Sequence, residues 1–433
     1  MSHQHGRVRT APAPRVSTAA RATIVTTVIL ATLAALFGVV HWWPNEENLD
    51  SVSGLIPLAV DGMEIVHGEL VRVQPACTGT EEDETSCGDS SVRILDGTNA
   101  GRVLPVSLAV NVVDTGLQSG DTVLLWDSSG TDNLNTSTDS STDDSTLTAS
   151  TSPVTFYGYD RGSAMIWLAI LFALAVILVA WRRGLMALIS LGFAGVVVVF
   201  FLLPSLVSGQ PAIPVTLAAS TLILVVILYL THGFSMRTSV ALVGALIGLA
   251  LSTGISWLSV IGTRIGGLGE EAAGLLSFNV SWVSVQHLVI ASVILAGIGT
   301  LNDVTVTQAS ALWELRAASP QLTRWELFRS GMRIGRDHVA STVYTLLFAY
   351  LGTALVLLVA VQLYGSTFEN FITADDVAEE VVRALAGGIA LALAMPVTTA
   401  IGAVIVAERG HDEYTPAHIA NDPWQDDPWQ KDD

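Results

Sequence analysis

The sequence is poor in cysteine, lysine and charge. Its 433 residues include two cysteines and a single lysine, Lys431, and charged residues make up 14% of the chain. Because hydrophobic residues reach 51% and the mean hydropathy is +0.54, the composition lies outside the range of soluble globular proteins. We therefore interpret the chain as an integral membrane protein whose surroundings are the lipid bilayer.

Motifs of soluble enzymes are also lacking. The chain has no Walker A sequence, no Gly-x-Gly-x-x-Gly after a predicted strand and no Gly-x-Ser-x-Gly turn. It has no His-Glu-x-x-His and no two histidines four residues apart to hold a metal ion. A basic stripe for nucleic acid is missing as well. We expect no enzymatic activity, no cofactor, no metal and no nucleic-acid partner.

Long apolar runs fill most of the chain. The first, within 22–43, ends in Trp42 and Trp43 and is longer than the core of a cleaved signal peptide, about 7–15 residues, so we predict an uncleaved anchor. Seven further runs approach the length of about twenty residues that crosses a bilayer. The sequence thus predicts an α-helical polytopic membrane protein of about eight transmembrane helices, the last seven within 163–407 at 163–181, 185–207, 214–231, 239–261, 284–307, 339–363 and 380–407.

Residues 44–160 form an acidic block with a different pattern. Short β-type segments alternate with turn residues, which predicts five strands, at 69–73, 91–95, 102–108, 122–126 and 153–157. Five strands at this spacing are typical of a small OB- or SH3-like barrel or of a sandwich. Residues 127–152 are a Ser/Thr/Asp-rich insertion of low complexity, which cannot pack a core.

The arginine distribution predicts the orientation. A cytoplasmic N-terminus places fourteen Lys and Arg residues inside and six outside, as the positive-inside rule requires. Arg316 then belongs to a cytoplasmic loop. The tails, 1–21 and 408–433, are predicted to be disordered and cytoplasmic, and the acidic β domain to be extracytoplasmic.

The two cysteines, Cys77 and Cys87, lie in the acidic block. A close pair in an oxidising compartment favours a disulfide that closes a loop, with free thiols as the alternative. A zinc site would need further ligands, and His67 is the only nearby candidate.

Several polar motifs in the apolar region carry a family resemblance. They are residues 300–310 with 313–316, residues 333–342 with 344–345 and 349–350, residues 231–233, and residues 270–273. Together they resemble the YibE/F family of bacterial membrane proteins, over roughly residues 60 to 407. The resemblance implies a multi-pass protein of the bacterial inner membrane, of a type labelled as a transporter without an established substrate. The family pattern has two consecutive acids at this place. This chain has Asn302 in place of the first, followed by Asp303.

Asp303 is the leading candidate for a functional residue, because ionisable groups in lipid-spanning runs are costly and usually serve a function. On helical geometry Asp303, Thr307 and Ser310 share one face, and Asp337, Ser341 and Thr345 form another polar stripe. We predict a hydrated polar site at the cytoplasmic helix ends, where Asp303 and Asp337 exchange protons and a histidine titrates near neutral pH. Its candidate residues are Asp303, Asn302, Thr305, Thr307, Gln308, His232, Arg336, Asp337, His338, Ser341 and Thr345.

A structural interpretation stays open beside this one. Asp303 would then mark a helix end, Asp337 would lie near the positive end of a helix dipole, and the hydroxyls would bridge helices. Small residues at Gly244, Gly248, Ser252 and Ser256 predict a closely packed helix pair.

Two functions fit these observations. The first is a secondary transporter or export permease for an unknown solute, which requires a continuous polar path through the bundle. The alternative is a non-transport envelope protein for binding, signalling or structure, whose β domain binds a partner in a cleft while the bundle is sealed. The sequence leaves a homo-oligomer open in both cases.

Overall fold

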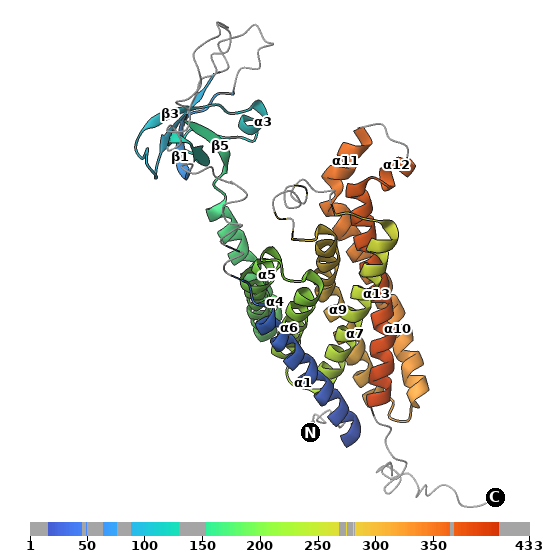
Figure 1. Cartoon of the computed structure of the whole chain (residues 1–433). Helices are drawn as coiled ribbons and strands as arrows, with labels where there is room; N and C mark the ends of the chain where they lie inside the picture. The colour runs from blue at the N-terminus through green and yellow to red at the C-terminus, as the bar shows by residue number, and fades with distance from the viewer. Residues whose placement is uncertain are drawn as a thin grey trace, which may run out of the picture. The chain divides into compact units, whose positions relative to one another are not determined.

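The computed structural model of the chain describes residues 16–45, 49, 64–75, 88–129, 153–267, 274, 280, 282–363 and 368–406. These residues form long helices and one small sheet (Figure 1). The chain divides into two compact units, Asp50–Trp181 and the combination of Met1–Leu49 with Arg182–Asp433. The predicted Cys77–Cys87 disulfide, most of the 127–152 insertion, residues 270–273 and the greater part of both tails lie outside the described residues.

Six helical stretches in the described residues are long and apolar enough to cross a membrane. They are α1 (Thr18–His41), the stretch Gly162–Val207, α6 (Ala212–His232), α7 (Met236–Thr263), α9 (Val285–Ala318) and most of α13 (Asp375–Ile405). The stretch Gly162–Val207 consists of α4 (Gly162–Val197), the π-helix η2 (Val198–Leu202) and α5 (Leu203–Val207). A multi-pass helical membrane protein is therefore confirmed.

The count of spans differs from the predicted eight at two places. The predicted spans 163–181 and 185–207 both lie within Gly162–Val207, where Trp181, with φ 50° and ψ −126°, interrupts the helix. The predicted span 339–363 covers the second half of α10 (Arg324–Thr353) and α11 (Leu355–Leu363), which is followed by α12 (Phe368–Ile372). It is not among the six stretches, because α10 is too polar and α11 too short.

Helices α9 and α10 extend well beyond the predicted ends. The run 284–307 was expected to stop near Gln308, but α9 continues to Ala318. Residues 309–318 contain no Gly or Pro, and the first proline, Pro320, comes after the helix. Helix α10 begins earlier than predicted, at a capping box between Thr323 and Glu326. The polar motifs around Asp303 and His338, which were expected at helix ends, therefore lie in helix interiors.

The larger unit is built around close contacts between α7, α9 and α13. A Cβ atom on Gly248 would come 2.7 Å from Leu301 Cδ2 and 3.0 Å from Ala394 Cβ, and Gly244 packs equally tightly against Thr398. The close packing predicted for this stripe of small residues is confirmed at both glycines, because no larger residue leaves room for the neighbouring helices.

The residues that flank α1 and α13 pair with each other, and Arg316 ties the second of them to the connection between α9 and α10. Val16, before α1, forms an antiparallel bridge with Val406, after α13. Arg316 is 2% exposed and donates hydrogen bonds to the carbonyls of Pro320 (3.2 Å), Leu322 (2.5 Å) and Val406 (3.5 Å). Arg316 is therefore a buried residue that joins three segments, whereas the sequence had placed it in a loop.

The smaller unit contains one curled antiparallel sheet with the order β3-β2-β1-β4-β5. Its strands are β1 (Glu64–Arg72), β2 (Ser90–Ile94), β3 (Val103–Val106), β4 (Thr122–Asp127) and β5 (Val154–Tyr159), with the short helix α3 (Val110–Val113) before β4. All five predicted strands are confirmed. The edge strands β3 and β5 contact each other, so the described residues form a curled, barrel-like sheet and not a two-sheet sandwich.

Candidate functional site

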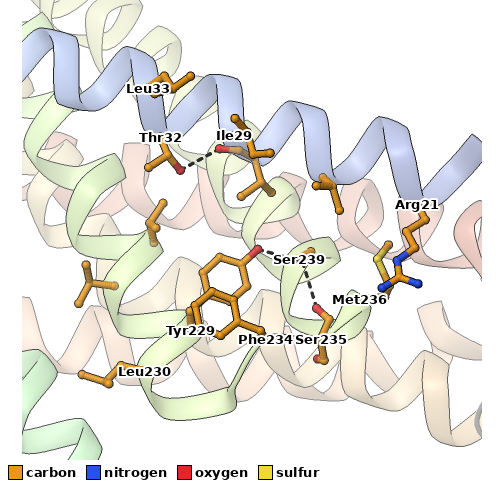
Figure 2. A pocket seen from close by; sticks show the side chains of 14 residues that line it. Arg21, Ile29, Thr32, Leu33, Tyr229, Leu230, Phe234, Ser235, Met236 and Ser239 are labelled. Carbon is orange, nitrogen blue, oxygen red and sulfur yellow. Dashed lines mark hydrogen bonds between the residues drawn. The ribbon is translucent and has the colours of Figure 1, made fainter.

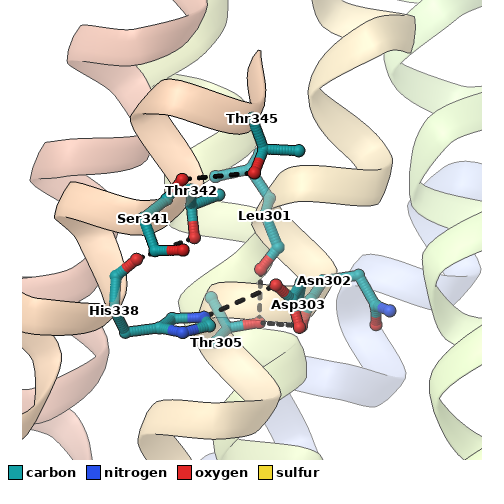
Figure 3. A network of polar contacts seen from close by, with 8 residues as sticks. All are labelled: Leu301, Asn302, Asp303, Thr305, His338, Ser341, Thr342 and Thr345. Atoms are coloured by element: carbon teal, nitrogen blue, oxygen red, sulfur yellow. Dashed lines mark hydrogen bonds and ion pairs between the residues drawn. The ribbon is translucent and has the colours of Figure 1, made fainter. Parts of the chain in front are cut away.

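Asp303 and His338 meet between the middle parts of two long helices. Asp303 is eighteen residues from the start of α9, or about 27 Å along its axis. His338 Nε2 lies 3.4 Å from Asp303 Oδ2, and Figure 3 shows the two side chains reaching toward each other from α10 and α9. The His338 side chain is 29% exposed and that of Asp303 59%. The Asp303 carboxylate is therefore largely exposed, whereas the His338 imidazole is mostly covered.

The neighbouring hydroxyl groups are held by the backbone of their own helices. Thr305 Oγ1 donates to the carbonyl of Leu301 at 2.8 Å, and Thr342 Oγ1 donates to that of His338 at 2.9 Å. Thr345 Oγ1 donates to Ser341 O at 3.2 Å (Figure 3). Because each hydroxyl donates its proton to a carbonyl, its oxygen lone pairs remain free to accept a hydrogen bond from a solute or from water.

The amide neighbours of Asp303 have different roles. Gln308 is 2% exposed, and its Nε2 donates to the carbonyl of Gly331 on α10 at 2.9 Å. Asn302 is half-buried, and its Oδ1 is buried without a hydrogen-bond partner among the described residues. Gln308 therefore connects two helices, whereas Asn302 presents an unused acceptor one residue from the carboxylate.

His232 lies apart from the Asp303–His338 pair, at the end of α6. His232 Nδ1 lies 2.7 Å from Thr231 Oγ1 at the end of α6, and the imidazole borders a small cavity of about 10 Å³ together with Arg237, Val306 and Ser310. That volume is close to the minimum for one water molecule. The cavity lies one to two turns along α9 from Asp303, so His232 is near the pair without touching it.

Arg336, Asp337 and Ser341 are exposed on α10, and Thr307 is half-buried on α9. Among the described residues Asp337 has no ion-pair partner, and the structure pairs Asp303 with His338. The sequence had paired Asp303 with Asp337, of the stripe Asp337–Ser341–Thr345, but the residue that contacts Asp303 is His338. Helix α10 is rotated so that the residue after Asp337 faces α9.

Four further hydroxyls form a feature that the site prediction did not include. The side-chain oxygens of Thr216, Ser220, Ser252 and Ser256 are buried and have no hydrogen-bond partner among the described residues. Serine and threonine hydroxyls inside helices usually bond to a carbonyl of the same helix or of a neighbour. Ser252 and Ser256 lie on the stripe of small residues of α7, and Ser252 Oγ faces Gly297 of α9. The sequence marked both serines for packing only.

Comparison with known proteins finds a family match over the second part of the chain. The model of the family described as YibE/F-like protein matches residues 168–408, which is more than half of the chain. The chain belongs to this family. The match covers the site helices α9 and α10 but begins after the β sheet, so the YibE/F-like region is shorter than the expected 60–407. No curated protein and no solved structure matches the chain.

Proposed function

We propose that this YibE/F-like protein is a membrane transporter in which Asp303 and His338 carry the coupling proton. The observation that carries the proposal is their 3.4 Å contact in the interior of α9 and α10. A carboxylate and an imidazole at this separation can exchange a proton directly or through one water, and histidine has the one side chain that ordinarily titrates near neutral pH.

The proton would change the attraction between the two helices. With His338 protonated and Asp303 ionised, opposite charges hold α10 against α9. Transfer of that proton to the Asp303 carboxylate leaves both groups neutral and removes the attraction. A contact that strengthens and weakens with one proton can couple proton movement to a change in access, as alternating-access transport requires.

Buried polar atoms supply the second part of the support. Asn302 Oδ1 and the hydroxyls of Ser252 and Ser256 lack partners among the described residues, although burying an unpaired polar group is unfavourable. Water or a polar solute that reaches these atoms would satisfy them. The solute proposed here is therefore polar.

Proton flux in proteoliposomes tests the proposal. A pH-sensitive dye is trapped inside, a potassium diffusion potential is imposed, and the initial rate of acidification is measured. We expect Asp303→Asn and His338→Gln each to lower the rate at least about a hundredfold, the lower end of what a positioned proton-transfer group contributes. Asp337→Asn is the matched control, because Asp337 neighbours His338 in sequence but does not face Asp303. Equal rates for wild type and Asp303→Asn would remove the proton-carrying role.

A labelling experiment tests the path separately. Ser256→Cys and Asn302→Cys are treated with a small water-soluble thiol reagent in the folded protein, in a background with Cys77 and Cys87 replaced by Ser. Reaction at both positions is expected of a hydrated path, with Ala219→Cys, which is fully buried and apolar, as the unreactive control. No reaction at Ser256→Cys and Asn302→Cys would indicate a sealed bundle.

A sealed bundle would favour the second function, in which the β domain binds a partner. Exposed apolar side chains on its sheet, and that of Leu95 just after β2, support that alternative: Ile65, Val71, Leu95, Val103 and Tyr157. In that case Ile65→Ser with Tyr157→Ser would abolish complementation of a deletion strain, whereas Asp303→Asn would leave complementation unchanged.

A further inference from the structure

A groove in the larger unit is not used by the proposed transport site. It has a volume of about 680 Å³ and lies between α1, the end of α6 and the start of α7 (Figure 2). This volume falls within the range of about 300–1,000 Å³ that is typical of small-molecule sites. Ile29, Leu33 and Phe234 in its lining are exposed, so the groove is open at the surface of the unit.

One face of α1 provides an apolar wall with a cation at its end. Arg21, Val25, Ile29 and Leu33 recur every four residues and line the groove together. The distance from Arg21 to Leu33 along the helix is about 18 Å. Figure 2 shows Arg21 beside Met236 at one end of the groove and Leu33 and Leu230 toward the other. The groove therefore has a charged end and a long apolar body.

The polar side chains of the opposite wall are already hydrogen-bonded within the protein. Tyr229 Oη and Ser239 Oγ are 2.9 Å apart, and the Tyr229 ring stacks on Phe234 with centroids 4.6 Å apart. Ser235 accepts a hydrogen bond from the amide of Thr238. Arg21 is exposed and has no ion-pair partner within the described part of the chain. Its guanidinium is thus the group in this groove that remains for a charged ligand.

The position of Arg21 matches the level of lipid phosphates. Helix α1 has 24 residues and rises about 36 Å, slightly more than the roughly 30 Å of hydrocarbon in a bilayer. Arg21 lies in its first turn, and Trp42 and Trp43 follow its last, so both ends carry residues that favour the membrane interface. When α1 crosses the bilayer, Arg21 is at the headgroup level and Val25 to Leu33 are at the level of acyl chains.

We propose that this groove binds one anionic phospholipid, with its phosphate at Arg21 and an acyl chain along α1 and α6. Arginine recognises phosphate through paired N–H donors, and negatively charged headgroups attract basic residues at the membrane surface. The bound lipid would fasten α1 to α6 and α7. This inference does not depend on the proposed proton transfer, because it shares no residue with Asp303 or His338.

Native mass spectrometry of the full-length protein tests the proposal. Delipidated protein is incubated with dioleoyl phosphatidylglycerol or, separately, with dioleoyl phosphatidylethanolamine, and the retained lipids per chain are counted. We expect one firmly retained phosphatidylglycerol and at least fivefold less phosphatidylethanolamine. Arg21→Gln should lower phosphatidylglycerol retention at least fivefold, while Arg329→Gln, an exposed arginine outside the groove, should not.

A second pair of variants tests the location. Ile29→Trp adds a ring inside the groove, whereas Leu30→Trp adds the same ring at an exposed neighbour outside its lining. Retention should fall with Ile29→Trp and stay at the wild-type level with Leu30→Trp. Unchanged phosphatidylglycerol retention in Arg21→Gln or Ile29→Trp overturns the proposal, and so does equal retention of the two lipids.

Discussion

Gln308 fixes the register between α9 and α10 through its hydrogen bond to the carbonyl of Gly331. The two helices are antiparallel neighbours, so moving back from Gln308 to Asp303 corresponds to moving forward from Gly331 to His338. A Cβ atom on Gly335 would come 2.9 Å from Gln308 Oε1 and 2.6 Å from Met395 Sδ, so the glycines allow this close approach. The contact between Asp303 and His338 thus depends on a buried amide about one turn away.

Replacing Gln308 should destabilise the bundle. Gln308→Ala removes the donor to the Gly331 carbonyl and the buried side chain between the two helices, for which we expect a loss of about 1–3 kcal/mol in the free energy of unfolding. Thr307→Ala, at the half-buried neighbour, should cost less than about 1 kcal/mol. Thermal unfolding in detergent measures both. A Gln308→Ala protein as stable as Thr307→Ala would show that this hydrogen bond does not hold the helices together.

Helix α7 offers a test of the packing against α9 and α13. Gly248→Ala places a methyl group 2.7 Å from Leu301 Cδ2 and 3.0 Å from Ala394 Cβ, and we expect overpacking of about 1–3 kcal/mol. Gly254→Ala on the same helix meets no atom within 4 Å and should be neutral or slightly stabilising. The difference between their unfolding temperatures is the measurement. The reverse order would contradict the close packing.

Replacing Trp181 with glycine should give a more stable protein than replacing it with alanine. Its φ of 50° with ψ of −126° is a conformation that side chains with a Cβ rarely adopt, and such strain is worth about 1–3 kcal/mol. Trp181→Gly should therefore be more stable than Trp181→Ala, although glycine is ordinarily about 1 kcal/mol worse within a helix. Thermal unfolding of the two variants decides this. If alanine is the more stable, residues 162–207 form an uninterrupted helix.

The β sheet should lose stability in acid through Asp127. This side chain is buried and accepts hydrogen bonds from Asn99 Nδ2 at 2.8 Å and from the Ser129 amide at 3.0 Å. Burial alone would raise the pKa of the Asp127 carboxyl, but the bonds from Ser129 and Asn99 and the charge of Arg102 lower it below 3.8.

Because the folded pKa is the lower one, the network stabilises the domain above pH 3.8, and this stabilisation is lost as the pH falls through the folded pKa. Amide hydrogen exchange in β4, corrected for intrinsic rates, should show protection that declines from pH 5 to pH 3 in wild type. Asp127→Asn should start with less protection and change less over the same range. A parallel decline in both proteins would assign the acid sensitivity to another group.

Much of the architecture follows from local sequence patterns. Alternating apolar residues such as Val123 and Leu125 predicted β4, and uninterrupted apolar runs predicted the membrane helices, because burial on one face or in lipid imposes those periods. The motifs around Asp303 likewise identified the family that the comparison shows. Helix ends were less predictable, since residues 309–318 can continue a helix or form a loop, and packing against α10 and α13 decides between them.

The sequence by itself determined that this protein crosses a membrane, where its β sheet lies in the chain, and that Asp303 stands in an unusually polar part of an apolar helix. Only the tertiary structure decided that His338, and not Asp337, faces Asp303. It also decided that Arg316 is buried and hydrogen-bonded to three carbonyls. It likewise decided that Arg21 lies at the end of the groove that we propose to bind a lipid. The physical reason is that composition and periodicity report the average surroundings of a segment. Which two side chains meet depends on helix rotation and register, and these are set by distant contacts such as Gln308 with Gly331.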